Sequence, residues 1–412
     1  MLTISRAERP QTQIQKPKIG LAIAGGGPLG AIYELGALHA LDESIDGLRL
    51  HRLDVYVGVS AGGFVAASLA NGLSTSQMVR IFSGEKDSEF FFKPEDFLRP
   101  AYREYLSRAR SLPAIIAEAL LQHARHPLRT SLTESMSKLS RAIPVGLFSN
   151  QRIQKFLERT FSGGGRSDDF RKLSCKLFIV AVDLDNGTAV RFGSEGFDDV
   201  PISTAVQASS ALPGMYPPVQ INGRYYVDGA LRRTMHASAA LQEGVDMLLG
   251  INPLVPFESE REDELTARHK DWVANLVEGG LPMVLSQTFR AMIQSRIKVS
   301  LDKYSDRYKG IDLILVEPDR GDEDIFFTNV FSFSSRKRLL EHAYMATRRQ
   351  IRRRQAELQE LLDPYGLVIN QALLADETHD LARSLLNDPS YHAPAARKLG
   401  RVLDDLDDVL SQ

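Results

Sequence analysis

The sequence predicts an α/β fold, in which helices pack on a sheet of strands, with helical insertions between them. Two short apolar runs, 18–25 and 55–59, each end at a glycine-containing turn, and a helix-like stretch follows each turn. Short apolar runs of this kind are typical of buried parallel strands. Further apolar runs at 176–185, 245–251 and 311–318 continue the pattern. Such alternation of strands and helices along a chain is typical of an α/β sheet.

Composition and charge narrow the class of protein. The 412 residues are 43% hydrophobic and 25% charged, and the formal net charge of −2 carries no nucleic-acid-binding signature. The single cysteine, Cys175, excludes an intrachain disulfide and a cysteine-rich metal site. The N-terminus has no apolar signal-peptide region, and glycine, proline or polar residues interrupt the longest uncharged stretches. We therefore expect a cytoplasmic protein without a nucleic-acid partner, whose contact with a membrane, if any, is peripheral.

The domain organisation follows from shifts in this pattern. Residues 1–16 are polar, and we expect a disordered N-terminal tail. Residues 17–353 form the expected main domain, with helical insertions at 78–161 and 258–305. The first insertion is rich in aromatic residues, and two interpretations stay open: a satellite core, or a cap that covers a site or touches lipid. Residues 354–412 are expected to form a C-terminal helical appendage that becomes acidic toward its end.

The strongest local motif is Gly-Val-Ser-Ala-Gly at 58–62, between a predicted strand and a predicted helix. That context is typical of a nucleophile elbow. A tight strand-to-helix turn holds Ser60 in a strained conformation, and glycine at 58 and 62 removes clashes with flanking side chains. The N-terminus of the following helix directs its N–H groups at the site. We interpret Ser60 as a nucleophile, and the alternative is an ordinary turn.

A nucleophilic serine needs a base. None of the nine histidines lies in a loop directly after a predicted strand. His236 comes nearest, but it falls where a helix is expected to begin, which favours a surface or capping role. Asp228 ends a predicted strand and precedes Gly229 and Ala230, and a partly buried carboxylate there could accept the serine proton. From the residues alone, Asp228 is either this base or a turn residue.

Asp183 and Asp185 are rival carboxylates. They lie where the strand at 176–185 runs into a hairpin indicated by Asn186 and Gly187. This setting favours structural hydrogen bonds over catalysis.

The glycine-rich loop 25–30 follows the first strand, and its spacing fits either a dinucleotide fingerprint or an oxyanion loop. A dinucleotide site needs an acidic residue at the end of the second strand, about 20 residues on. That strand ends at Ser60 instead, which disfavours nucleotide binding. Loops after neighbouring parallel strands emerge at the same edge of a sheet, so the glycine N–H groups are expected beside Ser60.

Three stretches in this order, GGGPLG at 25–30, GVSAG at 58–62 and DGA at 228–230, resemble the patatin-like phospholipases. The run AVQASSALPGMYPPVQINGRYYVDGA at 205–230 is also similar to the family's approach to its aspartate. The resemblance spans about 18–251 and resumes around 311–346, outside the insertions and the tail.

The resemblance implies a three-layer fold with a mostly parallel central sheet and helices on both faces. It also implies a Ser60–Asp228 dyad without histidine, acting on lipid or other acyl esters without a metal or a cofactor. Gly26 and Gly27 are the implied oxyanion donors. The resemblance assigns four glycines to the oxyanion hole: Gly25, Gly26, Gly27 and Gly30. It assigns Gly58 and Gly62 to the elbow, and Gly229 and Ala230 to the turn after the aspartate.

One position departs from the family. Leu29 stands where a basic residue is usual, and Pro28 has no N–H to donate. The loop therefore keeps backbone donors and lacks a positive charge. A run of basic residues lies further along the chain, at Arg348, Arg349, Arg352, Arg353 and Arg354. Two interpretations stay open: a solvated helix face, or a contact for anionic lipid.

The sequence predicts a serine esterase or lipid acyl hydrolase. Acyl transfer to an alcohol uses the same residues and stays open, as does a non-catalytic lipid-binding protein. We expect residues 90–105 to govern the use of long-chain or aggregated substrates.

Overall fold

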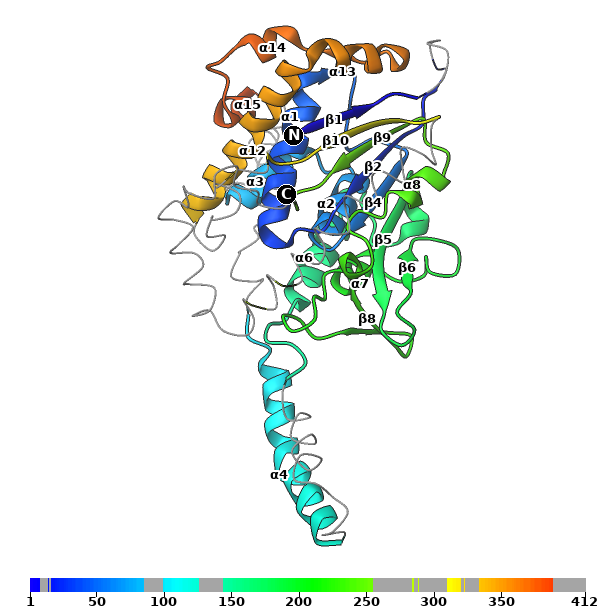
Figure 1. The fold of residues 1–412 in the computed structure, drawn as a ribbon, viewed down its shortest axis with the longest axis vertical. Helices are drawn as coiled ribbons and strands as arrows, with labels where there is room; N and C mark the ends of the chain where they lie inside the picture. The colour runs from blue at the N-terminus through cyan, green and yellow to red at the C-terminus, as the bar shows by residue number, and fades with distance from the viewer. Residues whose placement is uncertain are drawn as a thin grey trace, which may run out of the picture.

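The computed structural model describes residues 1–7, 14, 16–84, 99–125, 144–254, 284, 288, 310–319, 322 and 333–387. Its centre is a sheet that has nine strands within these residues, in the order β1-β10-β9-β2-β4-β5-β8-β7, with β6 paired to β5 (Figure 1). The strands are β1 (Leu2–Ser5), β2 (Ile19–Ile23), β4 (Val55–Val59), β5 (Lys176–Asp183), β6 (Ala189–Phe192), β7 (Val219–Ile221), β8 (Arg224–Asp228), β9 (Met247–Ile251) and β10 (Asp312–Val316).

The sheet is parallel at its centre and antiparallel at its edges. Strands β10, β9, β2, β4 and β5 run parallel to one another. The outer pairs, β1 with β10, β5 with β8, and β8 with β7, are antiparallel. The central parallel strands are buried on both faces, as their continuous apolar sequences predict. The expected mostly parallel sheet is confirmed.

Helices cover both faces of the sheet (Figure 1). One face carries most of them, including α1, α2 and α12, while α8 contacts β2 and β4 on the other. The helices are α1 (Gly27–Ser44), α2 (Ala61–Ala70), α3 (Thr75–Ser83), α4 (Tyr102–Arg125), α6 (Gln151–Phe161), α7 (Ile202–Ser209), α8 (Ser238–Gln242), α12 (Phe333–Arg353), α13 (Gln355–Leu362), α14 (Gln371–Ala375) and α15 (Leu381–Asn387).

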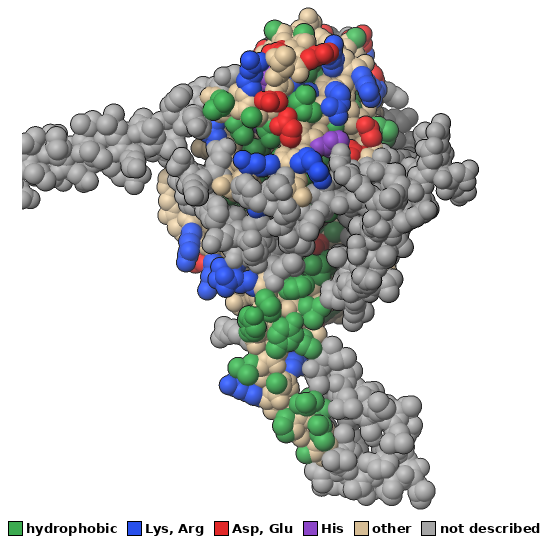
Figure 2. Space-filling view, turned by 90° about the vertical axis from the view of Figure 1, so that its left-hand side faces the viewer, with side chains coloured by type: hydrophobic (Ala, Val, Ile, Leu, Met, Phe, Trp, Pro, Cys, Tyr) green, Lys and Arg blue, Asp and Glu red, His purple; other side chains and the backbone are tan. Residues whose placement is uncertain are grey.

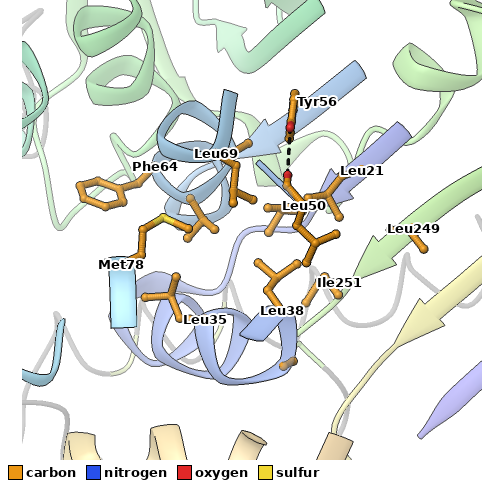
Figure 3. Close-up of a cluster of buried hydrophobic side chains, with 14 of the residues drawn as sticks. Leu21, Leu35, Leu38, Leu50, Tyr56, Phe64, Leu69, Met78, Leu249 and Ile251 are labelled. Carbon is orange, nitrogen blue, oxygen red and sulfur yellow. Dashed lines mark hydrogen bonds between the residues drawn. The ribbon is translucent and has the colours of Figure 1, made fainter. Parts of the chain in front are cut away.

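Alternating side chains of each central strand face two separate apolar layers. In β2, Leu21 belongs to the larger cluster beneath α1 and α2, and Ala22 belongs to the smaller cluster beneath α8. Figure 3 shows the larger cluster, in which Leu35 and Leu38 of α1 point toward the sheet. Tyr56 is buried there with its hydroxyl satisfied, since it donates to the carbonyl oxygen of Leu50 at 2.9 Å.

Helix α1 is buried on nearly all sides, because it lies between the sheet and α12. A helix that is apolar around its circumference is typical of such an internal position. Gly36 allows the close approach of α12, since a Cβ atom there would lie 2.6 Å from the carbonyl oxygen of Leu340. The glycine loop that precedes α1 is therefore attached to a buried, closely packed core element.

The two ends of the described chain differ from the sequence-based expectation. Leu2–Ser5 form β1, which pairs with β10, so the prediction of disorder is wrong for these four residues. A short polar strand at a sheet edge has no strong sequence signal, because its partner lies more than 300 residues away.

The C-terminal segment also differs from a purely helical appendage. Leu358, Leu361 and Leu374 belong to the main apolar cluster. Strand β11 (Val368–Ile369) pairs with β3 (Ile45–Asp46). Residues up to 387 thus pack as part of the same core, and 388–412 lie outside the described residues.

The two expected insertions are described unequally. The first contains α4 and α6, in agreement with its expected helical character, while its segments 85–98 and 126–143 lie outside the described residues. The second, 258–305, lies outside them apart from positions 284 and 288. Among the helices that the structure describes, none is long and apolar enough to cross a membrane.

Candidate active site

Ser60 occupies the sharp turn between β4 and α2. Its φ of 53° and ψ of −125° lie in a region that a non-glycine residue adopts only under strain. Gly62 is required because a Cβ atom there would lie 2.4 Å from the carbonyl oxygen of Ala24. Gly58 is required because a Cβ atom there would lie 2.5 Å from the Cα of Gly63. The turn therefore has the backbone of a nucleophile elbow.

The three motifs meet at one edge of the sheet. A Cβ atom on Gly25 would lie 3.0 Å from the Cβ of Ser60 and 3.3 Å from the Cβ of Ala230. The glycine loop, the elbow and the aspartate turn are thus in mutual contact. Gly229 packs against β5, since a Cβ atom there would lie 2.2 Å from the carbonyl oxygen of Val180.

Asp228 ends β8 and is buried beside the elbow serine. Its Oδ1 accepts a hydrogen bond from the amide of Ala230 at 2.8 Å. Burial raises the pKa of this carboxyl to about 6, and side-chain hydrogen bonding to Ser60 and the Ala230 amide opposes the shift. The group is therefore ionised at neutral pH but is a stronger base than an exposed aspartate.

The end of helix α7 and the residues directly after it support both Ser60 and Asp228. The Oγ of Ser209 accepts a hydrogen bond from the amide of Ser60 at 2.8 Å and donates to the carbonyl oxygen of Val180. The carbonyl oxygen of Ala211 accepts from the amide of Asp228 at 3.0 Å. These contacts give a physical role to residues 208–211 within the family-like run, and to Ser209, for which the sequence alone predicted none.

Two of the four loop glycines do not have amides available for a substrate. The amide of Gly25 donates to the carbonyl oxygen of Thr234 at 3.2 Å, and the amide of Gly30 donates to the carbonyl oxygen of Gly26 at 3.0 Å. Gly25 and Gly30 therefore belong to the loop without donating to a substrate, because both N–H groups are already used in the fold. The amides of Gly26 and Gly27 have no hydrogen bond within the described part of the chain.

The same loop is shaped by close packing. A Cβ atom on Gly26 would lie 2.6 Å from the Cγ of Pro253, and one on Gly30 would lie 3.0 Å from that atom. Gly27 has a φ of 61°, which favours glycine, and Pro28 opens α1 behind it. Gly25 and Gly30 thus shape the loop, whereas Gly26 and Gly27 carry the amides that the fold leaves unused.

The rival residues have structural positions. Asp183 accepts hydrogen bonds from the Asp185 amide at 2.9 Å and from Arg224 at 3.0 Å, which confirms its expected structural role. His236 is buried, not at the surface, and its Nε2 lies 3.3 Å from the carbonyl oxygen of Gly229. Burial lowers the pKa of His236 to about 4, so its neutral ring buttresses the aspartate turn.

The basic run on α12 is only partly a solvated face. Arg348 is buried and donates to the carbonyl oxygens of His379, Leu373 and Asp376. Arg352 pairs with Glu377 at 2.9 Å. These arginines attach the C-terminal segment to α12. Among the described residues, no cluster of three or more His, Cys, Asp or Glu side chains could hold a metal ion.

The fold and the elbow at its sheet edge define a class of protein, an α/β hydrolytic enzyme. A sequence model of the patatin-like phospholipases matches residues 21–241, more than half of the chain. The chain belongs to the patatin-like phospholipase family, as its motifs predict. It is a lipid acyl hydrolase.

Several solved structures are similar to this chain. VipD from Legionella pneumophila is 16% identical with a TM-score of 0.33, over 93% of this chain and 85% of that one. The type III effector protein ExoU of Pseudomonas aeruginosa is 16% identical with a TM-score of 0.35, over 100% of this chain and 68% of that one. Human GIVD cytosolic phospholipase A2 is 14% identical with a TM-score of 0.35, over 85% and 60% respectively.

Proposed function

We propose that this enzyme hydrolyses carboxylic ester bonds of lipids with Ser60 as nucleophile and Asp228 as general base. The observation that carries the proposal is the contact of a strained serine with a buried carboxylate whose pKa is raised to about 6. A general base works best when its pKa lies near the working pH, because it is then mostly deprotonated and still binds a proton strongly. His236 is not assigned to proton transfer, because its ring faces the Gly229 carbonyl and its pKa is lowered to about 4.

The acylation step transfers one proton and forms one bond. Asp228 takes the proton of the Ser60 hydroxyl while Oγ attacks the ester carbonyl carbon. The tetrahedral intermediate collapses, and the protonated Asp228 gives its proton to the departing alcohol oxygen. An acyl group then remains bound to Ser60.

Deacylation repeats these steps with water. Asp228 removes a proton from water, the hydroxide attacks the acyl carbonyl carbon, and Ser60 leaves with that proton. The product is a carboxylic acid, and both side chains return to their starting protonation states.

The amides of Gly26 and Gly27 are proposed to stabilise the oxyanion. Their position is supported by the contact of the preceding residue, Gly25, with Ser60 and Ala230. The N-terminus of α1, which begins at Gly27, adds a partial positive charge at the same place. Loss of one such donor typically lowers turnover by about 10²–10³. Leu29 supplies no charge, so stabilisation of an anionic head group has to come from elsewhere.

A fluorophosphonate probe tests the nucleophile directly. We expect it to label the wild-type protein once and to fail with Ser60→Ala. Ser68→Ala is the matched control, because Ser68 lies buried in α2, the helix that follows the elbow, and donates to the Phe64 carbonyl oxygen at 2.9 Å. Labelling that persists in Ser60→Ala, or disappears in folded Ser68→Ala, would falsify the assignment.

A further inference from the structure

Helix α4 (Tyr102–Arg125) projects away from the body of the molecule (Figure 1). Large apolar side chains on it are exposed to solvent. Tyr102 is 72% exposed, Leu106 is 52% exposed and Ile116 is 42% exposed. An isolated exposed leucine needs no explanation, but several on one helix face indicate a binding surface.

These side chains form one stripe along the helix. Tyr102, Leu106, Ala109, Pro113 and Ile116 follow one another at intervals of three or four residues, and all are exposed. With Leu112 at its margin, the stripe covers roughly 120° of the helix at about 100° per residue. Figure 2 shows green apolar side chains along this projecting helix.

Arginines border the stripe on both sides. Arg110 is exposed at one border. Arg108 lies at the other, paired with Glu104 at 2.9 Å. Over its length the helix contains four arginines and two glutamates. An apolar stripe between cationic borders is typical of helices that lie in the interface of an anionic membrane.

The base of α4 is bonded to the region around the candidate active site. The amide of Ala101 and the hydroxyl of Tyr105 both donate to the carbonyl oxygen of Leu147, at 3.0 and 2.7 Å. The amide of Leu147 in turn donates to the carbonyl oxygen of Gly214 at 3.3 Å. That carbonyl belongs to the loop between α7 and β7, which continues to Tyr216.

The same loop begins at Ala211, whose carbonyl oxygen accepts a hydrogen bond from the amide of Asp228 at 3.0 Å. Further along it Tyr216 is buried; burial raises the pKa of its hydroxyl, and the charge of Asp228 adds to the shift. A surface bound to α4 would therefore be held at a defined position relative to the sheet edge that carries Ser60 and Asp228.

We propose that the apolar stripe of α4 binds the surface of a lipid bilayer that contains anionic head groups. This inference rests on the proposed function for its substrate, a lipid ester. The apolar side chains would enter the interface while Arg110 and Arg108 contact head-group phosphates. A second copy of the chain fits the stripe less well, because pairing would bring arginine-bordered faces together.

Vesicle binding by the 412-residue protein tests the proposal. The protein carries Ser60→Ala, so that binding is measured without turnover, and is sedimented with vesicles of phosphatidylcholine, with or without phosphatidylglycerol. We expect binding to the anionic vesicles and at least about a tenfold loss with the double change Leu106→Asp and Ile116→Asp, since two exposed apolar contacts are removed. Arg110→Glu is expected to weaken binding to the anionic vesicles selectively, and added salt should do the same.

A matched control uses apolar residues elsewhere on the surface. Leu386 is 59% exposed and Val368 is 55% exposed, both in the C-terminal segment. The double change Leu386→Asp and Val368→Asp should leave vesicle binding unchanged. Equal loss with both double variants, or no loss with the α4 variant, overturns the proposal. A concentration-dependent dimer that disappears with the α4 changes, without vesicle binding, assigns the stripe to a second copy instead.

The test of the α4 surface can be distinguished from the test of the proposed Ser60 chemistry. In the active protein, the α4 double variant should hydrolyse a short soluble ester at the wild-type rate and lose activity on vesicle substrate. If the Ser60 assignment is wrong, fluorophosphonate labelling persists in Ser60→Ala while vesicle binding still reports on α4. If only the α4 proposal is wrong, labelling is lost with Ser60→Ala and vesicle binding is insensitive to the stripe.

Discussion

The candidate active site and helix α4 are held in opposite ways. Bonds from several elements hold the site: Ser209 of α7 accepts from the Ser60 amide, and the Thr234 carbonyl oxygen accepts from the Gly25 amide. The described contacts of α4 with the body are concentrated at its base, around Leu147. Chemistry that needs accurate positions lies where many elements converge, and the exposed stripe lies where few do.

This difference predicts two kinds of variant. Changes at the sheet edge should impair hydrolysis of every ester, soluble or aggregated. Changes on the α4 stripe should impair only hydrolysis at a lipid surface. At the sheet edge, we expect effects on turnover that decrease from Asp228 through Gly62 to His236.

Asp228→Asn should have the largest effect. The amide cannot accept the serine proton, so turnover of a soluble ester should fall by about 10³-fold or more. The same change should stabilise the folded protein. Ionising the buried Asp228 carboxyl costs free energy in the native state, as its pKa, raised from 3.8 to about 6, indicates, and asparagine removes this cost. A shift of about two units corresponds to about 3 kcal/mol in the free energy of unfolding at pH 7.

Denaturant unfolding and ester turnover check both effects in one protein. If Asp228→Asn were inactive only because it unfolds, its unfolding midpoint would fall instead of rise. Turnover close to wild type would remove Asp228 from the mechanism and break the contrast between the two regions.

Gly62→Ala should have the next largest effect. The new Cβ would lie 2.4 Å from the Ala24 carbonyl oxygen, so the elbow or the end of β2 has to move. We expect about 1–3 kcal/mol of destabilisation and about a hundredfold loss of turnover from the displaced serine. Gly63→Ala is the matched control, because its Cβ would meet nothing closer than 3.7 Å. Similar losses in both variants would mean that helix composition, not the clash, matters.

The pH dependence of turnover should follow Asp228. Because only the ionised carboxylate accepts a proton, kcat/KM for a soluble ester should rise about tenfold per unit below pH 6 and level off above it. Fluorophosphonate labelling should follow the same curve. A midpoint near pH 4 would indicate a solvated carboxylate and contradict the buried dyad.

The same shift predicts the sign of a stability effect. The unfolded chain releases this proton near pH 3.8 and the native protein near pH 6, so the Asp228 contribution falls as pH rises between these values. His236 has the opposite sign. Its pKa is lowered from 6.5 to about 4, so its contribution falls as pH drops between those values.

His236→Ala should have the smallest effect on chemistry. It removes the bond to the Gly229 carbonyl oxygen, which still accepts from the amide of Arg232 at 3.1 Å, so we expect a cost of about 0.5–1.5 kcal/mol. Turnover of a soluble ester should stay within severalfold of wild type. His236→Asn distinguishes loss of the ring from backbone strain, since asparagine tolerates the φ of 48° at this position. Loss of activity comparable to Asp228→Asn would indicate a three-residue relay.

Much of the fold could be predicted from local sequence. The strand at 55–59, the turn at Ser60 and the hairpin after β5 appear at the expected positions, because apolar runs and glycine turns determine them locally. The family, the mostly parallel sheet and the enzyme class also follow from motifs within 18–251. The dyad and its oxyanion donors stay predictions, supported by geometry.

Other features depend on partners that are distant in the sequence. Strand β1 pairs with β10, β11 pairs with β3, and the Ser209 hydroxyl meets the Ser60 amide 149 residues away. No local pattern indicates such partners.

The glycine loop shows this division most clearly. The sequence by itself determined that the loop would lie beside Ser60, because parallel strands bring their following turns to one edge of a sheet. Only the tertiary structure decided which of its amides are used elsewhere. Gly25 donates to Thr234 and Gly30 donates to Gly26, which leaves Gly26 and Gly27 as the donors to test. A backbone amide has the same chemistry at every residue, and its availability depends on the acceptor that the fold brings to it.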